Sequence, residues 1–233
     1  MGDATIRFLV FGAGVLGCNL TRNLLRAGKD VTLLARGQWA ESIRKDGLRI
    51  KDKLSPRMSV SRVPVVSELK PEDWYDVIFV VMRYTQLGSI LDALRTNPTR
   101  NIFFVGNNVR SAALAASLPE KNVLFAFASS TGHRERGYVA SVDLKKIIIG
   151  QLSGAPSNEK LIGQIFDGTK YKVTYEPNMG GLPSLPRGIR AAGGLCLLQS
   201  GRRSEKAQGE HGLFEPSDRC QHRGLSHHPK RWA

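Results

Sequence analysis

The sequence predicts an α/β fold with a mostly parallel, doubly wound sheet, followed by a largely irregular C-terminal tail. Three observations support this fold. A glycine-rich turn follows the first apolar run of the chain. Strand-like and helix-like segments then alternate as far as about residue 180, which is typical of helices that cover both faces of a sheet. The run over 76–81 is mostly apolar, as expected for a strand buried on both faces.

The individual elements follow from local patterns. Leu16, Leu20 and Leu24 recur every four residues, and Gly28 stands where a glycine commonly ends a helix, so we expect a helix between Leu16 and Gly28. The other expected helices are 37–46, 84–96, 109–118 and 158–166. The expected strands are 6–11, 30–35, 76–81, 102–105, 123–128, 138–140, 146–149 and 171–175, with a hairpin over 47–52 and 58–64 and a polar loop over 131–137.

The glycine turn after the first strand is the most informative motif. It consists of Gly12, Ala13, Gly14, Val15, Leu16 and Gly17. Gly12 permits a tight turn, Gly14 lets a pyrophosphate approach the backbone, and Gly17 lets the following helix pack close to the strand. The start of that helix offers free N–H groups to phosphate. We therefore predict a Rossmann-type dinucleotide site; the alternatives are a different ligand, as in methyltransferases, or none.

The end of the second predicted strand indicates which dinucleotide binds. An NAD site usually carries an acidic residue there, about 20 residues after the glycines, which accepts hydrogen bonds from the ribose hydroxyls. Here Arg36 occupies this region, and no carboxylate follows it before Glu41. A guanidinium pairs with a 2′-phosphate, which a carboxylate would repel. The sequence therefore favours NADP(H), and the alternative is a solvated Arg36 without a ligand.

Two further polar residues follow predicted strands, at the edge where such sheets bind ligands. Arg83 follows the strand over 76–81 and can donate hydrogen bonds to a carboxylate or phosphate; the alternative is a solvated arginine before a helix. Asn107 follows the strand over 102–105 and can donate or accept a hydrogen bond near the nicotinamide. We predict that both residues bind the cofactor and take part in catalysis. Asn108 is better explained as a helix N-cap.

Composition narrows the function classes. The net charge of +14 suits an anionic cofactor, and no helix-turn-helix, RNP or zinc-finger pattern directs that charge toward nucleic acid. Three cysteines form no disulfide framework, so we expect a cytoplasmic protein. No apolar run is long enough to span a bilayer, and we expect no membrane partner. The spacing of Cys220, His222, His227 and His228 matches no standard zinc site, so we predict no metal.

Four segments together resemble the ketopantoate reductase (2-dehydropantoate 2-reductase) family. They are the glycine turn over 12–17, the end of the second strand over 34–37, the strand end over 77–82 and the segment over 103–108. The resemblance extends over roughly residues 5–180. It implies NADPH-dependent reduction of the ketone of a small 2-oxo acid by hydride transfer.

The resemblance also assigns roles to individual residues. It implies that Arg36 binds the 2′-phosphate and that Asn107 lies beside the substrate and the nicotinamide. The family usually has a lysine at the position of Arg83. An arginine keeps the positive charge but does not release its proton, so acid–base function would have to come from another group.

The chain departs from this family after about Met179. The family continues into an all-helical domain that supplies a catalytic lysine, whereas 181–233 is rich in Gly, Pro, Arg, Ser and His and has no sustained helical periodicity. We expect an NADP-binding Rossmann domain over 1–180 and a mostly disordered basic tail over 181–233. A shifted reading frame is one explanation of this tail. The chain is then either a ketoacid reductase or an inactive protein that still binds NADP(H).

Overall fold

The computed structural model describes residues 6–55, 57–106, 110–152 and 154–179. Asn107 and Asn108 lie outside these residues, as does the whole segment over 181–233 with its two cysteines and its histidines. The division of the chain at residue 180 therefore stays a prediction. In the described part of the chain, every helix is too short or too polar to cross a membrane.

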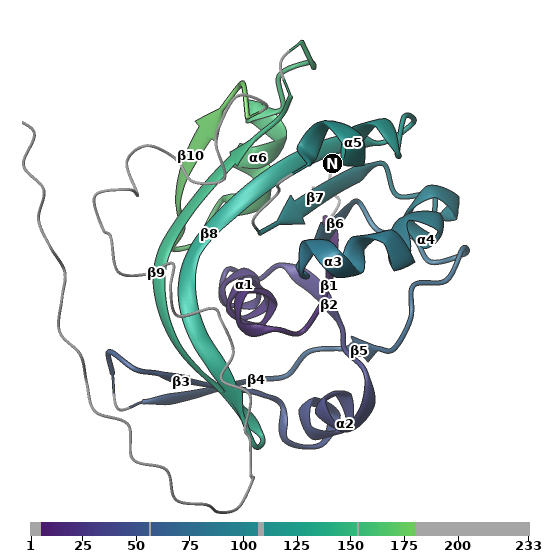
Figure 1. The fold of residues 1–233 in the computed structure, drawn as a ribbon. Coiled ribbons are helices and arrows are strands. Elements are labelled where there is room, and N and C mark those ends of the chain that lie inside the picture. The colour runs from purple at the N-terminus through teal and green to yellow at the C-terminus, as the bar shows by residue number, and fades with distance from the viewer. Residues whose placement is uncertain (1–5, 56, 107–109, 153, 180–233) are drawn as a thin grey trace, which may run out of the picture. The chain divides into compact units, whose positions relative to one another are not determined.

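Strands and helices alternate along the described chain except over 48–80, where four strands follow one another, and over 122–150, where two strands form a long hairpin (Figure 1). The elements are β1 (Arg7–Phe11), α1 (Val15–Arg26), β2 (Asp30–Leu34), α2 (Gly37–Asp46), β3 (Leu48–Asp52), β4 (Met58–Ser61), β5 (Val65–Val66), β6 (Val77–Val80), α3 (Tyr84–Leu87), the 3-10 helix η1 (Gly88–Ile90), α4 (Leu91–Thr96), β7 (Asn101–Val105), α5 (Ser111–Ala116), β8 (Asn122–Glu135), β9 (Tyr138–Gly150), α6 (Glu159–Phe166) and β10 (Lys172–Glu176).

All the described strands belong to one sheet, with the order β4-β3-β9-β8-β7-β6-β1-β2-β5 and β10 paired to β9. From β5 to β8 every neighbouring pair is parallel. In sequence order, those six strands follow the 3-2-1-4-5-6 arrangement typical of dinucleotide-binding sheets. Among the described strands, the pairs β3–β4 and β8–β9 alone are antiparallel. The predicted Rossmann-type, mostly parallel α/β fold is therefore confirmed.

The core lies on both faces of this sheet. In β6, Val77 and Phe79 belong to the apolar cluster that includes Leu20 and Leu24 of α1. Ile78 and Val80 belong to a second cluster, formed with side chains of α3 to α5. Each of the four β6 side chains is at most 1% exposed. The mostly apolar run predicted this double burial, because side chains alternate between the two faces of a strand.

Local patterns gave most boundaries to within two residues. The strand expected over 58–64 ends at Ser61, the short strand β5 was not predicted, and three larger corrections follow. The helix expected over 84–96 is divided into α3, η1 and α4, and η1 begins at Gly88, a residue that weakens helices. The polar loop expected over 131–137 is mostly strand, since β8 continues to Glu135. The two strands expected at 138–140 and 146–149 form a single strand, β9. Pairing between β8 and β9 satisfies their backbone groups and overrides the polar composition.

The β8–β9 hairpin extends far beyond the parallel sheet and curls around α1 (Figure 1). The first five residues of β8 pair with β7, and the rest of the strand pairs only with β9. The start of β9 also pairs with β3, and its end pairs with β10. As a result, α1 packs against the hairpin as well as against β1 and β2.

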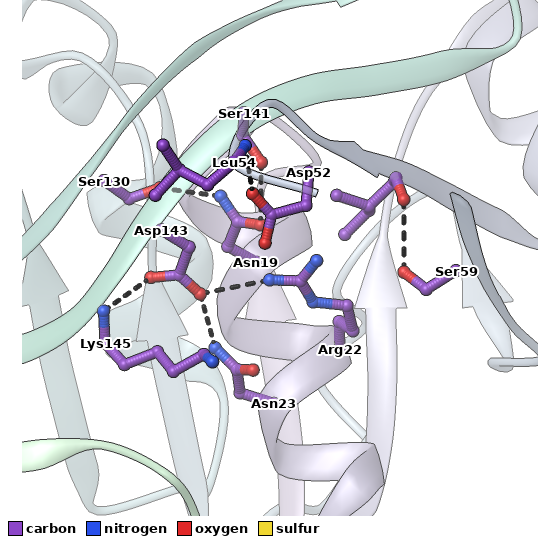
Figure 2. Close-up of polar contacts among 11 residues, drawn as sticks. Asn19, Arg22, Asn23, Asp52, Leu54, Ser59, Ser130, Ser141, Asp143 and Lys145 are labelled. Carbon is purple, nitrogen blue, oxygen red and sulfur yellow. Dashed lines mark hydrogen bonds and ion pairs between the residues drawn. The ribbon is translucent and has the colours of Figure 1, made fainter. Parts of the chain in front are cut away.

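A buried polar cluster joins α1 to this hairpin (Figure 2). Arg22 and Asp143 form an ion pair with 3.1 Å between Nη2 and Oδ2, and each side chain is 3% exposed. The amide of Asn23 donates to the same carboxylate oxygen at 2.7 Å. One turn earlier, Asn19 donates to Ser130 Oγ at 2.6 Å and accepts from Ser141 Oγ at 3.1 Å. The cluster therefore attaches one face of α1 to both strands of the hairpin.

Asp143→Asn should strongly destabilise the fold. The substitution leaves the Arg22 guanidinium buried without its counter-charge, which typically costs about 3–5 kcal/mol. Chemical denaturation measures this as a lower free energy of unfolding. Asp92→Asn is the control, since Asp92 pairs with Arg95 at the surface and its side chain is 90% exposed. A loss for Asp143→Asn no larger than that for Asp92→Asn would show that the buried pair does not hold the hairpin.

Candidate functional site

Four parallel strands end together at one edge of the sheet. Phe11 of β1 is in register with Leu34 of β2 and with Val80 of β6, and β7 follows alongside β6. The glycine turn begins directly after β1, Arg36 lies two residues after β2, and Arg83 lies three residues after β6. The fold therefore brings these three predicted segments to the edge where open α/β sheets bind their ligands.

The three glycines of the turn differ in how much room a side chain would have at each position. Gly12 has a φ of +121°, and a Cβ there would lie 2.3 Å from the carbonyl oxygen of Val81. A Cβ at Gly17 would lie 1.9 Å from the oxygen of Gly12, so only glycine allows α1 to approach the turn this closely. A Cβ at Gly14 would meet nothing within 4 Å, and Gly14 is exposed. The space beside Gly14 is where a ligand could approach the backbone.

The start of α1 is suited to an anion. Gly14 is its N-cap, no side chain caps the helix, and its first turn contains no acidic residue. The first N–H groups of a helix have no partner within it and carry partial positive charge. Because α1 has twelve residues and is anchored by the buried polar cluster, these donors have a fixed direction.

Arg36 is exposed at the end of β2 and is the N-cap of α2. Its Nε donates a hydrogen bond to the carbonyl oxygen of Ser67 at 3.2 Å, which holds the guanidinium beside the strand end. Among the described residues, no hydrogen bond or ion pair uses its two terminal nitrogens. A guanidinium held through its Nε can donate from its two terminal nitrogens to a pair of anionic oxygens in a forked arrangement.

Trp39 and Arg134 complete this edge and were not predicted from the sequence. Trp39 Nε1 donates to the carbonyl oxygen of Ala13, within the glycine turn, at 2.9 Å. The Arg134 guanidinium carbon lies 5.4 Å from the centre of the Trp39 ring. Arg134 comes from β8, about a hundred residues further along the chain, so no local pattern could place it here. The only feature of the sequence that could have pointed to Trp39 is its position three residues after Arg36.

Cys18 lies under the glycine turn and has no role as a nucleophile in this state. Its Sγ donates to Ala13 O at 3.4 Å, and the residue is fully buried. Burial raises the pKa of the thiol to about 12, although the positive charge of Arg134 and a hydrogen bond with Trp39 act in the opposite direction. The thiol is therefore neutral at physiological pH and serves to fill space between α1 and the turn.

Arg83 and Gly106 follow β6 and β7 on the other side of the candidate site. Arg83 is exposed and is the N-cap of the short helix α3, with extended backbone angles. After β7, Gly106 has a φ of +148° and its N–H bonds the carbonyl oxygen of Ala126 at 2.9 Å. Asn107, the next residue, lies outside the described part of the chain. The roles of Arg83 and Asn107 therefore stay predictions.

Comparison with known proteins agrees with this fold. The family model for ketopantoate reductase PanE/ApbA matches residues 8–154, more than half of the chain. The uncharacterized oxidoreductase YkpB of Bacillus subtilis is 31% identical over 90 residues, which are 39% of this chain and 29% of YkpB. The matched segment is therefore much shorter than either protein.

Solved structures show the same fold at low sequence identity. A 2-dehydropantoate 2-reductase from Porphyromonas gingivalis W83 has a TM-score of 0.64 at 18% identity, and the alignment covers 76% of this chain and 66% of that protein. A D-mandelate dehydrogenase, solved with NADH and anilino(oxo)acetate, has a TM-score of 0.61 at 16% identity, with 73% and 57% covered. The chain thus matches less than two thirds of the length of either structure.

Gly17→Ala should destabilise the protein, because the added methyl group would collide with the backbone oxygen of Gly12. We expect a loss of about 1–3 kcal/mol in the free energy of unfolding, as for other overpacked sites. Gly163→Ala is the matched control: Gly163 lies inside helix α6 with nothing within 4 Å of a Cβ. That change should stabilise the protein by about 0.5–1 kcal/mol. Equal effects of the two substitutions in thermal or chemical unfolding would contradict the close packing.

Proposed function

The chain belongs to the ketopantoate reductase PanE/ApbA family of oxidoreductases, and from this membership we propose that it binds NADP(H) at the glycine turn and reduces the ketone of a small 2-oxo acid. As parts of the same proposal, the partner is a small molecule rather than nucleic acid or a membrane, and the protein acts in the cytoplasm. The observation that carries the choice of cofactor is the exposed guanidinium of Arg36 at the end of β2.

The described residues fit such a cofactor at two points. The open space beside Gly14, in front of the uncapped start of α1, accommodates a pyrophosphate that accepts hydrogen bonds from backbone N–H groups. Arg36 stands where an NAD site carries a carboxylate, and its two unpaired terminal nitrogens suit a 2′-phosphate. When bound, the cofactor would supply a hydride to the ketone carbon.

The chain's own residues would then hold the substrate. In this proposal Arg83, which follows β6, pairs with the carboxylate of a 2-oxo acid. Asn107, which follows β7 in the sequence, hydrogen-bonds the ketone oxygen. A guanidinium keeps its proton in proteins, so Arg83 would orient and stabilise charge rather than transfer a proton. The proton that completes the reduction would have to come from another group.

A second candidate function is cofactor binding without turnover. It is favoured by the sequence over 181–233, which lacks the apolar helical pattern that a substrate-closing helical domain would need. The two candidates share the same NADP(H) site and differ only in catalysis. Incubating the purified chain with NADPH and a panel of 2-oxo acids distinguishes them: loss of absorbance at the nicotinamide band supports reduction, and binding without such loss supports the second candidate.

Arg36→Gln should weaken NADPH binding about tenfold and leave NADH binding nearly unchanged, because only NADPH carries the 2′-phosphate. Energy transfer from tryptophan to the bound nicotinamide measures both affinities. The matched control is Arg26→Gln, which removes the same charge at the opposite end of α1. If Arg36→Gln and Arg26→Gln reduce NADPH affinity equally, or if neither changes it, the assignment of Arg36 is wrong.

A further inference from the structure

The tip of the β8–β9 hairpin reaches the same edge of the site as Arg36. The turn of the hairpin lies beside α2 (Figure 1), where a Cβ at Gly137 would be 4.0 Å from the hydroxyl of Ser42. Within the hairpin, Ser130 is in register with Asp143, and Arg134 with Val139. Because side chains two residues apart share a face, Arg134 projects on the same side as Ser130, which contacts α1.

Arg134 is held at this edge by the Trp39 ring. The indole N–H is fixed by its hydrogen bond to Ala13, so the ring has one orientation relative to the glycine turn. The guanidinium lies over that ring at 5.4 Å, a cation–π geometry that restrains a long side chain. Because the Trp39 ring bonds Ala13, the guanidinium over that ring lies beside the glycine turn. Its positive charge opposes the rise in the pKa of the Cys18 thiol, which lies under the same turn.

Arg134 is exposed, and none of the described carboxylates forms an ion pair with it. Arg36, three residues before Trp39, is also exposed and also has no ion pair among the described residues. Two guanidinium groups without an ion pair among the described residues therefore belong to this edge: Arg134 lies over the Trp39 ring, and Arg36 precedes that tryptophan at the end of β2. An ordinary surface arginine is mobile and solvated, whereas this one is fixed by an aromatic ring that itself bonds the glycine turn. Such a pair of fixed cations is suited to a doubly charged anion.

We propose that Arg134 is a second cofactor-specificity residue, which binds the 2′-phosphate of NADP(H) together with Arg36. This inference rests on the proposed function. A phosphate monoester carries a charge of about −1.5 to −2 at neutral pH, so one guanidinium neutralises it only in part and two match it. The pyrophosphate has its own donors at the start of α1. The hairpin thus contributes to cofactor choice from a strand outside the parallel βαβ unit.

The test compares Arg134→Gln with Arg136→Gln in the full chain. Arg136 lies two residues further on, in the turn of the same hairpin, and its loss changes the net charge equally. Isothermal titration measures binding of NADPH, NADH, adenosine 2′,5′-bisphosphate and adenosine 5′-phosphate to each variant. We expect Arg134→Gln to weaken NADPH and the 2′,5′-bisphosphate about tenfold, with NADH and adenosine 5′-phosphate within a factor of two. Arg136→Gln should change all four by less than a factor of three.

Each other outcome overturns a defined part of the inference. Unchanged NADPH affinity in Arg134→Gln, with weaker binding in Arg36→Gln, would remove Arg134 from the site and leave the proposed function intact. Equal losses for NADPH and NADH would mean that Arg134 does not read the 2′-phosphate. Equal losses in the Arg134 and Arg136 variants would reduce the effect to overall charge. No binding of NADPH to the unmodified chain would overturn both the inference and the proposed function.

Discussion

The position of the hairpin depends on the buried ion pair between Arg22 and Asp143. Arg22 belongs to α1, whose start forms the glycine turn, and Asp143 belongs to β9, which pairs along its length with β8. With Asn23 on the same carboxylate and Asn19 between Ser130 and Ser141, the pair fixes the hairpin against α1 at several points. From this pair, α1 leads back to the glycine turn, and the hairpin leads to Arg134 at the candidate cofactor edge. The same contact therefore helps to fix both the direction of α1 and the location of Arg134.

Burying an ion pair costs desolvation free energy, and the main contribution of this pair is to define how the hairpin sits against α1. Two apolar residues could give a comparable stability, but they would not define one register between helix and hairpin. The carboxylate of Asp143 accepts from Arg22 and Asn23 through one oxygen, and from the backbone N–H of Lys145 through the other. A shift of β9 by one residue would turn Asp143 to the outer face and leave Arg22 unpaired. The long hairpin is thereby held in the arrangement that surrounds α1.

Local patterns predicted most elements of the parallel sheet because the apolar periodicity of each segment matches the faces that it buries. The bounds of α2 agreed with the pattern residue for residue, and β6 was recognised by its apolar run. The hairpin was not predicted over 131–137, where polar residues are typical of a loop and only the pairing with β9 makes them a strand. Likewise Asn19, Arg22 and Asn23 form a polar stripe at helical spacing that usually faces solvent. Here the hairpin covers it.

The residues of the candidate site likewise differ in whether a local sequence pattern can predict them. The roles of Gly12 and Gly17 are local, since a turn between a strand and a helix sets their geometry, and the sequence predicted that geometry correctly. Arg36 was accessible to prediction because it directly follows a strand. Trp39 could be seen only as a tryptophan near that arginine, and Arg134 depends on a contact across about a hundred residues. Residues that reach a site from another element cannot be found by patterns confined to one segment.

The most direct measurement of the central claim is a crystal structure of the chain with NADP+. We expect the pyrophosphate beside Gly14, against the first N–H groups of α1, and the 2′-phosphate within hydrogen-bond distance of the Arg36 guanidinium. Density for the dinucleotide at any other edge of the sheet, or a 2′-phosphate directed into solvent away from Arg36, would contradict the account.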